Sequence, residues 1–445
     1  MTNTDFIRMV RDAGIVGEGG AGFPAHVKFD TKADTLIANG CECEPLLYSD
    51  QHIMKHHAHE IVRAMQSVMV AIGATRGVIG IKKKYTAISK ILKEAIGTTG
   101  IELAELDNFY PAGDEQILIH EVTGKTVPPL GLPKDLGVVV TNVGSLLSVA
   151  NAMKSIPVTS KIVTVTGEVA KPSIIQVPIG TSVLDCIEYC GGFKVPNPIV
   201  VLGGPMMGRY IDTAAQLNTE VITKTVGGII VLPRGHYLHE AATLPVEVMQ
   251  KRAATACIQC RLCTELCPRY LMGQGFETHR VMWVFSGGID QGEGALQAMM
   301  CCECGVCELF ACPMRLSPRR INVMFKNRFR EAKIQYQGPR KVNPHQSEFR
   351  EFRKVPTPRL VIKTDLDGYL SLRPEFAGTF MPKSVRIPLR QHIGAPTVPL
   401  VKAGSPVKVG DCIAEIPDGA LGAKVHASID GMVTVIDNSI TIQGT

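Results

Sequence analysis

The sequence predicts a multidomain chain of mixed α/β and α+β class. At 445 residues the chain exceeds the length that one hydrophobic core ordinarily supports. Its content of 45% hydrophobic and 20% charged residues is typical of folded domains and not of disordered chains. Along the chain, strand–helix alternation gives way to a cysteine-rich middle and then to a β-rich end. We therefore expect several separate cores joined in one polypeptide.

Residues 1–155 are expected to form an α/β domain. Short runs rich in apolar and β-branched residues alternate there with segments of helical periodicity, in which Ile61, Met65 and Val68 share one face. Such alternation favours a sheet of mostly parallel strands. The expected strands are 34–38, 77–81 and 137–140, and the expected helices are 53–73 and 85–96.

Residues 156–245 are expected to form a smaller β-rich unit wrapped on one helix. Thr181 or Ser182 can cap that helix, which runs over 183–190 and ends at Gly191-Gly192. The expected strands are 162–166, 174–177 and 200–202.

The C-terminal third contains two further regions after the cysteine-rich one. Residues 331–365 are polar and contain several prolines, which suits a linker or an extended arm. Residues 366–445 have strand and turn signals and almost no helical periodicity, which predicts a small all-β barrel or sandwich.

Composition restricts the class of partner and the compartment. No run of 18 apolar residues predicts a transmembrane segment, and residues 1–11 lack the apolar core of a signal peptide, so we expect a cytoplasmic protein. The net charge is +6, there is one tryptophan, and Lys82-Lys83-Lys84 is the one charge run, which we interpret as a solvated element end. These features predict no nucleic-acid partner. Because the cytosol keeps thiols reduced, 14 cysteines favour metal ligation over disulfides.

Two cysteine runs within residues 246–330 carry the strongest chemical signal. Three cysteines two residues apart can wrap three corners of one [4Fe–4S] cluster, and a fourth cysteine followed by proline commonly ligates the other cluster. The first run is Cys257, Cys260, Cys263 and Cys267, and the second is Cys301, Cys304, Cys307 and Cys312. We therefore assign one cluster to Cys257, Cys260, Cys263 and Cys312, and the other to Cys301, Cys304, Cys307 and Cys267. The second run has one extra residue before its last cysteine.

Alternatives to this assignment are few. A pair of zinc ribbons would need well-separated Cys-x2-Cys pairs and would not need tight triplets that end in Cys-Pro. Cys302 lies beside Cys301 and could replace it as a ligand. The remaining cysteines are interpreted as small buried residues; they are Cys41, Cys43, Cys186, Cys190 and Cys412.

A second candidate cofactor-binding region begins at a glycine-rich loop, Gly17 to Phe23. Closely spaced glycines let backbone amides approach a phosphate or a planar ring, although the loop is neither a Rossmann fingerprint nor a Walker loop. Three later segments accompany it, at 39–45, 110–115 and 141–146. Together the four segments resemble the FMN-binding fold of the flavoprotein subunit of respiratory complex I and of Rnf-complex C subunits, over roughly residues 10–150.

That resemblance implies a set of site residues. The glycine loop and Lys28 would hold the flavin, Asn39 and Glu42 would face its ring, and Glu44 would contact NADH. Here Glu18 stands where the complex I relative has a basic residue, and Cys41 replaces an aspartate. The implied cofactor-binding residues are Gly17, Gly19, Gly20, Gly22, Phe23, Lys28, Asn39, Glu42, Glu44, Tyr110, Gly113, Asp114, Glu115 and Asn142.

Two further segments resemble known domains. Residues 163–207, with Thr166-Gly167-Glu168 and Gly203-Gly204-Pro205, resemble a soluble-ligand-binding β-grasp (SLBB) domain. Residues 392–431 resemble the barrel-sandwich domain of Rnf-complex C subunits, which lies first in that family and last here. This order is similar to that of the cobalamin reductases of propanediol-utilisation microcompartments. Asp50-x-His52 is similar to the start of a corrinoid-binding motif, but Lys55 occupies its glycine position, and we interpret the nearby histidines as a solvated helix face.

Two functions follow as expectations. The first is an oxidoreductase that passes electrons from NADH through FMN and two [4Fe–4S] clusters to a corrinoid. The resemblance implies a corrinoid adenosyltransferase and microcompartment shell or enzyme proteins as partners, inside a bacterial microcompartment. The alternative is an electron-relay subunit of an Rnf-type ferredoxin:NAD oxidoreductase or other assembly, without independent NADH oxidation. Glu18 and Cys41 favour this alternative, as do two β-rich domains with no evident chemistry.

Overall fold

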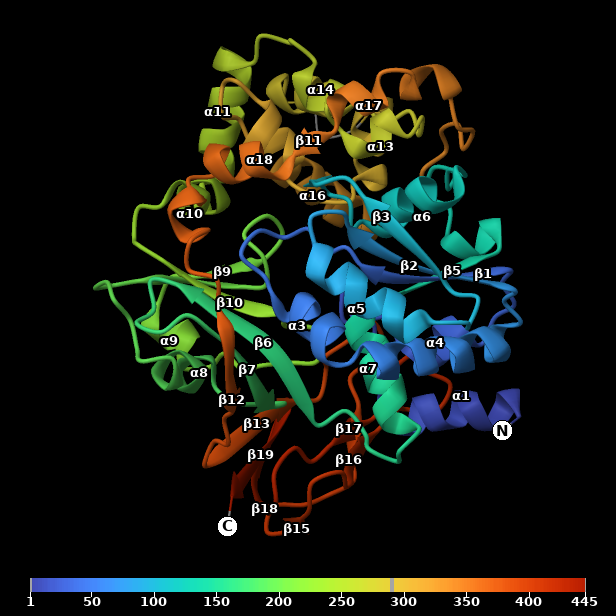
Figure 1. The fold of residues 1–445 in the computed structure, drawn as a ribbon. Coiled ribbons are helices and arrows are strands. Elements are labelled where there is room, and N and C mark those ends of the chain that lie inside the picture. The colour runs from blue at the N-terminus through green and yellow to red at the C-terminus, as the bar shows by residue number, and fades with distance from the viewer. Residues whose placement is uncertain (1, 289–291, 445) are drawn as a thin grey trace.

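A computed structural model describes residues 2–288 and 292–444 of the chain. Residues 1, 289–291 and 445, which fall within the first, third and last predicted domains, lie outside the described part. Figure 1 shows a blue α/β domain beside a green β-sheet, with yellow and orange helices above them and a red β-rich region below.

The N-terminal domain is built on a four-stranded parallel sheet with the order β3-β2-β1-β5. Its strands are β1 (Thr35–Gly40), β2 (Arg76–Lys82), β3 (Glu102–Leu106) and β5 (Val138–Asn142), and β4 (Phe109–Tyr110) lies apart from this sheet. Its helices are α1 (Asn3–Asp12), α2 (Ala25–Phe29), α3 (Ser49–His56), α4 (Ala58–Ile72), α5 (Thr86–Ile96), α6 (Glu115–Thr123), the short η1 (Pro133–Leu136) and α7 (Val143–Ala152). The predicted parallel α/β architecture is thus present, and the helix expected over 53–73 is two helices separated at His57.

Strand alternation gives this sheet a core on each face. Leu36 and Ala38 of β1 pack with α4 and α7, whereas Ile37 packs with α6 on the opposite face. From β1 the chain proceeds to β2 and β3 on one side and later places β5 on the other. The carboxyl ends of β1 and β5 therefore form a topological switch point, where open α/β sheets bind ligands.

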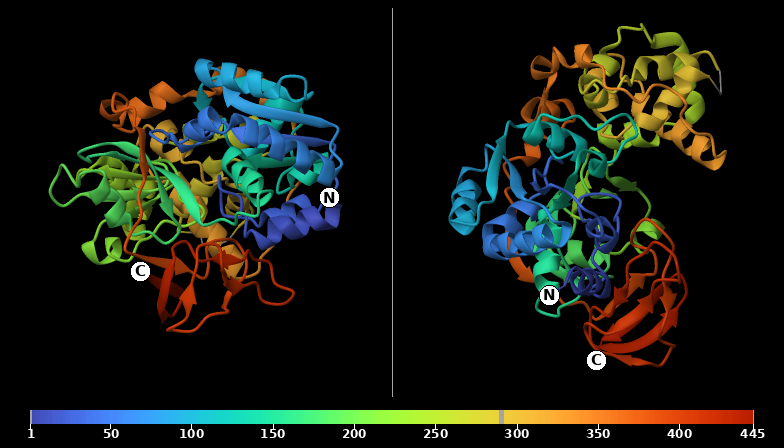
Figure 2. Two further views of the ribbon diagram at one scale, coloured as in Figure 1. Left: turned by 60° about the horizontal axis from the view of Figure 1, so that its bottom comes forward. Right: turned by 90° about the vertical axis from the view of Figure 1, so that its right-hand side faces the viewer.

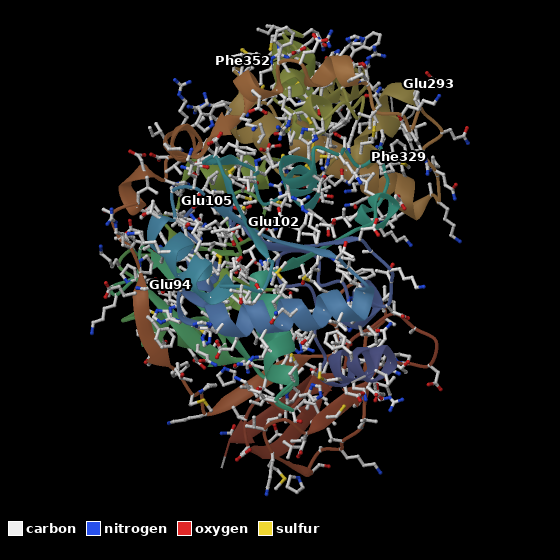
Figure 3. The ribbon with its side chains drawn as sticks, turned by 45° about the vertical axis from the view of Figure 1, so that its right-hand side comes forward. Glu94, Glu102, Glu105, Glu293, Phe329 and Phe352 are labelled. Atoms are coloured by element: carbon white, nitrogen blue, oxygen red, sulfur yellow. The ribbon has the colours of Figure 1, made fainter. Side chains whose placement is uncertain are left out.

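The outer edge of the same sheet is occupied by charged side chains. Glu102 and Glu105 of the edge strand β3 are labelled in Figure 3; Glu102 pairs with Arg76 at 2.8 Å, and Glu105 accepts a hydrogen bond from Ser89. Charges on an edge strand discourage pairing with another chain. The edge and the switch point thus lie in different parts of the domain.

The second domain contains a six-stranded sheet with the order β12-β7-β6-β10-β8-β9. Its elements are β6 (Ser160–Gly167), β7 (Ser173–Pro178), α8 (Val183–Tyr189), β8 (Ile199–Leu202), β9 (Arg209–Ile211), α9 (Ala214–Leu217) and β10 (Gly228–Leu232). Ser182 caps α8, as predicted, by accepting the Asp185 N–H. The sixth strand, β12 (Glu375–Thr379), comes from the C-terminal part of the chain and runs parallel to β7.

The cysteine-rich domain is helical. Its elements are α10 (Tyr237–Thr243), α11 (Val246–Ala256), α12 (Leu262–Glu265), α13 (Pro268–Leu271), α14 (Thr278–Ser286), α15 (Glu293–Leu296), η2 (Gln297–Met300), the π-helix η3 (Val306–Ala311) and α16 (Pro318–Glu331). Its core joins Phe276, Phe285 and Phe325 to Cys267 and Cys301. The cysteines are therefore part of the core that holds these short helices together.

Residues 331–365 are more ordered than a linker requires. They contain η4 (Pro344–Ser347), α17 (Arg350–Arg353), β11 (Val355–Pro356) and α18 (Thr357–Lys363), followed by η5 (Asp367–Tyr369). β11 pairs antiparallel with β4, which places Val355 opposite Tyr110. This segment thus attaches the cysteine-rich domain to the N-terminal domain.

The C-terminal region folds into two antiparallel sheets, with orders β13-β19-β18-β15 and β14-β16-β17. Their strands are β13 (Ser384–Pro388), β14 (Val398–Pro399), β15 (Pro406–Val407), β16 (Cys412–Glu415), β17 (Val425–His426), β18 (Gly431–Ile436) and β19 (Ser439–Gly444). Figure 2 shows this region at the end of the molecule opposite the cysteine-rich helices. Within the described residues, no helix is long and apolar enough to cross a membrane.

Candidate flavin and iron–sulfur sites

A cavity of about 370 Å³ lies at the carboxyl ends of β1 and β5. It is lined by almost all of the residues that the resemblance assigns to the flavin: Gly17, Gly19, Gly20, Gly22, Phe23, Lys28, Asn39, Glu42, Glu44, Gly113, Asp114, Glu115 and Asn142. Tyr110 does not line the cavity, and its hydroxyl points to another partner described below. The fold therefore brings four distant segments to one site.

Two glycines allow the backbone around the cavity to pack closely. A Cβ on Gly113 would lie 2.3 Å from the Cys41 carbonyl oxygen, so no side chain fits there. Gly22 has φ +75°, and a Cβ on it would lie 2.9 Å from the His392 Cα of the C-terminal region. The glycine-rich loop thus touches a second domain as well as the cavity.

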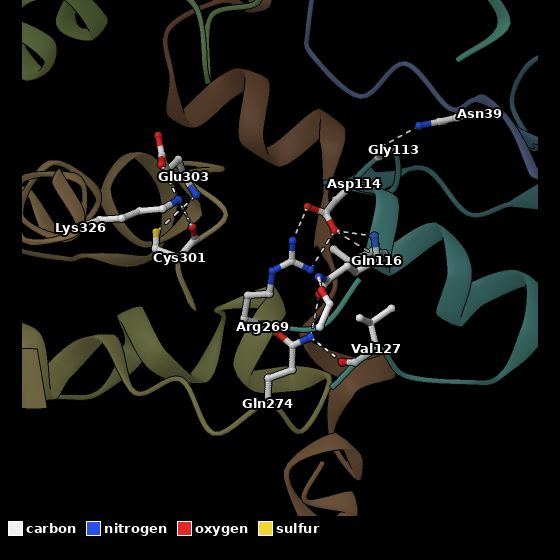
Figure 4. Close-up of polar contacts among 12 residues, drawn as sticks. Asn39, Gly113, Asp114, Gln116, Val127, Arg269, Gln274, Cys301, Glu303 and Lys326 are labelled. Carbon is white, nitrogen blue, oxygen red and sulfur yellow. Dashed lines mark hydrogen bonds and ion pairs between the residues drawn. The ribbon is translucent and has the colours of Figure 1, made fainter. Parts of the chain in front are cut away.

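Polar side chains fix the walls of the cavity. The Lys28 ammonium donates to the Val140 carbonyl at 2.9 Å and pairs with Glu115 at 3.1 Å. The Asn39 amide donates to the Gly113 carbonyl at 2.9 Å (Figure 4), and its oxygen accepts the Cys41 N–H. Asn39 therefore positions the loops on both sides of the cavity.

Three carboxyl groups of the cavity are shifted toward their neutral form. Burial raises the pKa of Glu44 to about 7, and burial together with the neighbouring Asp50 raises the pKa of Glu42. Burial likewise raises the pKa of Asp50, which accepts a hydrogen bond from Asn142 at 2.8 Å. Lys82, expected to be solvated, is 1% exposed and lies near Glu42 as a compensating cation.

Glu44 has one oxygen available to a ligand. Its Oε2 accepts the Met206 N–H at 2.8 Å, whereas its buried Oε1 has no hydrogen-bond partner among the described residues. The loop that supplies this contact is the Gly203-Gly204-Pro205 segment of the β-grasp domain, and a Cβ on Gly204 would overlap the Glu44 side chain. Met207 of the same loop lines the cavity. The β-grasp domain, which had no evident chemistry in the sequence, therefore forms one wall of the site.

Sequence reasoning assigned no role at this site to Asp50, Ser145, Met207 or Cys304, which also line the cavity. Only Ser145 belongs to one of the four segments that resemble the FMN-binding fold. The other three lie outside those segments, so the motifs alone could not place them at the cavity. Glu18 is not a lining residue; it forms an ion pair with the buried Lys161 of β6 and accepts a hydrogen bond from Ser148. The acid at this position thus links two domains and does not point at a ligand.

The cavity suits FMN on its own chemistry. It combines a glycine cradle, backbone donors, the Lys28 ammonium and an unpartnered carboxylate oxygen in a space large enough for a cofactor. Lys28 and the glycine loop would hold the phosphate, and the polar groups of β1 and β5 would face the ring.

The four cysteines of the first set surround a second cavity. It is lined by Cys257, Cys260, Cys263 and Cys312, the four residues assigned to one cluster from their spacing. Cys260 is exposed and the adjacent Ile258 is 64% exposed, so this set lies at the protein surface. The Leu316 N–H donates to the Cys312 sulfur at 3.4 Å, a contact that would stabilise a thiolate ligand.

The extra residue before Cys312 has a structural explanation. In the first run, three residues between Cys263 and Cys267 pass through the single α-helical turn α12, whereas in the second run four residues between Cys307 and Cys312 pass through the π-helix η3. A π-helical turn is wider by one residue than an α-helical turn. The insertion is therefore absorbed in the helix, and Cys312 reaches the first set.

The second cysteine set is buried. Cys267, Cys301, Cys304 and Cys307 are each at most 8% exposed. The Glu303 N–H donates to the Cys301 sulfur at 3.3 Å, and Lys326 donates to the Cys301 carbonyl at 2.9 Å (Figure 4). The thiol of Cys302, the alternative ligand to Cys301, lies beside that of Cys304.

Eight free thiols in two groups suit iron–sulfur clusters better than single ions. Among residues 2–288 and 292–444, no three His, Cys, Asp or Glu side chains converge closely enough to hold one metal ion. A four-iron cluster takes one thiolate at each iron, so its ligands surround it and do not converge on a point.

The second set adjoins the flavin cavity. Cys304 lines the cavity, and its carbonyl accepts a hydrogen bond of 2.7 Å from the buried Tyr110 hydroxyl. Asp114, which also lines the cavity, forms a two-point ion pair with Arg269 at 2.8 and 2.9 Å (Figure 4). Gln274 adds hydrogen bonds to Gln116 and to the Val127 carbonyl. These contacts hold the helical domain against the N-terminal domain at the cofactor sites.

Comparison with protein families identifies four matching regions. Residues 10–151 match the Nuo51 FMN-binding domain, residues 162–210 the SLBB domain, residues 256–317 a 4Fe-4S dicluster domain and residues 370–445 the RnfC barrel sandwich hybrid domain. The chain therefore carries an FMN-binding domain and a dicluster domain, as the sequence predicted. This defines a class of flavin- and iron–sulfur-containing electron-transfer proteins.

Among characterised proteins, cobalamin reductase PduS of Citrobacter freundii is 42% identical over 440 residues, covering 97% of this chain and 95% of its own length. Cobalamin reductase PduS of Salmonella typhimurium is 42% identical over 438 residues, with the same coverage of 97% and 95%. The C subunit of the proton-translocating ferredoxin:NAD(+) oxidoreductase complex of Clostridium ljungdahlii is 35% identical over 274 residues, covering 60% of this chain and 56% of its own length. The chain belongs to the cobalamin reductase PduS family.

Proposed function

We propose that the chain is an NADH-dependent cobalamin reductase that holds FMN in the cavity at β1 and β5 and one [4Fe–4S] cluster on each cysteine set. When bound, FMN accepts electrons in pairs and releases them singly, which suits iron–sulfur centres. The relatives that match almost the whole chain are cobalamin reductases. The observation that carries the proposal is the contact of Cys304 with both the cavity and Tyr110.

The three sites form a series from the interior to the surface. Cys304 of the buried set lines the flavin cavity, Cys307 of the same set lies within electrostatic reach of Cys263, and Cys260 of the first set is exposed. This order favours the first set as the exit to a corrinoid.

The proposed roles of the cavity residues follow from their chemistry. Backbone N–H groups of the glycine loop and the Lys28 ammonium supply donors and positive charge for the FMN phosphate. Glu44 has a pKa of about 7 and an unpartnered oxygen. Near neutral pH it can therefore donate a hydrogen bond to a nicotinamide amide or accept one from it. Met207 places an apolar side chain on the β-grasp side of the cavity.

The finer partners belong to the same proposal. The corrinoid would be presented by a corrinoid adenosyltransferase, in a propanediol-utilisation microcompartment together with its shell or enzyme proteins. The alternative, a relay subunit without NADH oxidation, is supported by the relative from a ferredoxin:NAD(+) oxidoreductase complex, but that relative matches 60% of the chain and the PduS relatives match 97%.

Anaerobic mixing of the FMN- and iron-loaded protein with NADH tests the proposal. The expected result is bleaching of the flavin absorbance, followed by reduction of added cob(III)alamin. If the flavin stays oxidised after NADH is added, the protein does not oxidise NADH, and the alternative function as an electron-relay subunit is supported. A variant with Cys412→Ser, which removes a thiol remote from both cysteine sets, should behave as the unaltered protein.

A further inference from the structure

A third hollow, of about 780 Å³, shares the lining residue Ala21 with the flavin cavity. Three domains besides the N-terminal one contribute to it: Arg330 comes from the end of α16, Thr223 and Thr225 from the β-grasp domain, and Arg390 from the C-terminal region. Ala21 of the glycine-rich loop lines both the hollow and the flavin cavity. We call this hollow the four-domain cleft.

The walls of the four-domain cleft are fixed by specific contacts. Gly22 packs directly on the backbone of Gln391 and His392, as its missing Cβ allows. The Gln391 side-chain oxygen accepts the Lys224 N–H at 3.1 Å, and the buried Lys224 ammonium donates to the carbonyls of Gly14 and Lys424 at 2.7 and 2.6 Å. One lysine thus joins three domains directly behind the cleft, so the cleft is a built feature of the fold.

Charge distinguishes the four-domain cleft from the flavin cavity. Five carboxylates line the flavin cavity with one lysine, Lys28; they are Glu42, Glu44, Asp50, Asp114 and Glu115. Of the residues that the structure describes, Arg330 and Arg390 line the cleft and no carboxylate does. Among the described residues, Arg390 has no ion-pair partner, and Arg330 makes one long contact, 3.4 Å to the Asn327 side chain. Two guanidinium groups are therefore available to an anion.

A buried histidine forms part of the cleft wall. His392 is 7% exposed and lines the cleft, and its Nε2 accepts the Ala423 N–H at 2.8 Å. This contact fixes the imidazole against the C-terminal region and so fixes this part of the wall.

We propose that the four-domain cleft binds the phosphate-bearing end of a ligand whose reactive end enters the flavin cavity. Guanidinium pairs and hydroxyls are groups that recognise a diphosphate. The two hollows meet at Ala21, which lines both, so a ligand long enough to pass this residue can occupy the two together. The inference rests on the proposed function, in which NADH delivers its electrons at the flavin cavity and the corrinoid takes them at the first cysteine set. The ligand is therefore NADH, whose diphosphate would lie in the cleft while its nicotinamide enters the flavin cavity.

Binding to the loaded protein tests the cleft without relying on turnover. Equilibrium dialysis would measure the dissociation constants of NAD+ and hydroxocobalamin for the unaltered protein and for the double variant Arg330→Ala/Arg390→Ala. Each lost charge-assisted hydrogen bond should weaken binding roughly tenfold, so the double variant should bind NAD+ roughly 100-fold more weakly and hydroxocobalamin as before. The Arg330→Lys/Arg390→Lys variant should recover part of that loss, because it keeps the charge.

The control is the double variant Lys333→Ala/Arg386→Ala, which removes the same charge from positions that do not line the cleft. It should keep both dissociation constants within about twofold. A loss for NAD+, with no loss for reduced nicotinamide riboside, which lacks the diphosphate, is the expected result. A loss confined to hydroxocobalamin would overturn the proposal, as would unchanged binding of NAD+. Failure of the proposed function would appear separately, as absent flavin bleaching by NADH in the unaltered protein.

Discussion

The two cysteine sets share a sequence motif but differ in depth. The set of Cys267, Cys301, Cys304 and Cys307 is buried against the N-terminal domain, where Tyr110 and Arg269 cross the junction. The set of Cys257, Cys260, Cys263 and Cys312 surrounds a surface cavity, and Cys260 is exposed. Both runs begin with the same Cys-x2-Cys-x2-Cys triplet, so the fold and not the triplet decides which set is buried and which is exposed.

The largest effect expected from this difference is on electron delivery. Cys304→Ser and Cys260→Ser should each lower the iron content by half and reduce corrinoid reduction by at least about 100-fold, because each removes a ligand of one centre in the series. FMN content should stay unchanged in Cys260→Ser, whose site lies away from the cavity. Iron and flavin quantification on anaerobic protein would check both variants.

Cys304→Ser should also disturb the cavity that Cys304 lines, and so slow NADH-driven reduction of a flavin-reactive dye, which Cys260→Ser should leave intact. Equal dye reduction by the two variants would show that depth does not separate the two sites. Cys412→Ser is the matched thiol control.

Iron removal should distinguish the sets kinetically. A ferrous chelator under mild oxidation should extract half of the iron roughly tenfold faster than the rest, because thiolate sites react according to their exposure. In Cys260→Ser the fast phase should be missing, and in Cys304→Ser the slow one. The measurement is chelator absorbance against time, and a single phase in the unaltered protein would contradict the difference in depth.

NADH binding at the flavin cavity should depend on pH near neutrality. Burial raises the pKa of Glu44 from 4.5 to about 7, so its carboxyl is neutral below that pH and ionised above it. The apparent KM for NADH should therefore rise about three- to tenfold from pH 6 to pH 8, as the carboxylate comes to repel the anionic nucleotide. Glu44→Gln should give a flat profile over this range. A profile that keeps its slope in the variant would assign the titration to Glu42 or Asp50.

The smallest effect is expected for the hydrogen bond across the junction. Tyr110→Phe leaves the buried Cys304 carbonyl without its donor, at a cost of about 1–3 kcal/mol. We expect corrinoid reduction to slow severalfold and the spectrum of the buried centre to change, with the iron content retained. Tyr336→Phe, which packs against the helical core away from the cavity, should change neither. A spectrum identical to that of the unaltered protein would show that Tyr110 has only a packing role.

Local patterns predicted the parts of the molecule that depend on local chemistry. Cysteine spacing and the Cys-Pro pairs predicted both sets. The extra residue before Cys312 showed that the second run differs from the first, but not that the difference is a π-helix. The strands β1, β2 and β5 followed from short β-branched runs, because burial on both faces requires them. The resemblance then brought the flavin residues together at the switch point.

The parts missed by the sequence depend on contacts between distant segments. Arg269 and Met207 reach the flavin site from other domains, and nothing in their neighbouring residues indicates it. Lys82 was interpreted as solvated from its charged neighbours, but its place at the end of the buried strand β2 puts it under the carboxylates of the cavity. The domain roles of β11 and β12 likewise depend on strand pairing across more than 190 residues, which short-range periodicity cannot show.

The pairing of β11 with β4 and of β12 with β7 has a consequence for the order of synthesis. As the chain leaves the ribosome, its first two domains emerge complete in sequence but with two strand edges unpaired, and domains fold from the N-terminus onward. Those edges are closed only when residues 355 to 379 emerge, after every cysteine of both sets. The residues of the cofactor sites are therefore all synthesised before residues 355–379 fix the domains in place. Figure 1 shows this segment running from α18, beside the cysteine-rich helices, down to β12. Cofactor insertion can then precede the last folding step, in which β11 pairs with β4 and β12 with β7.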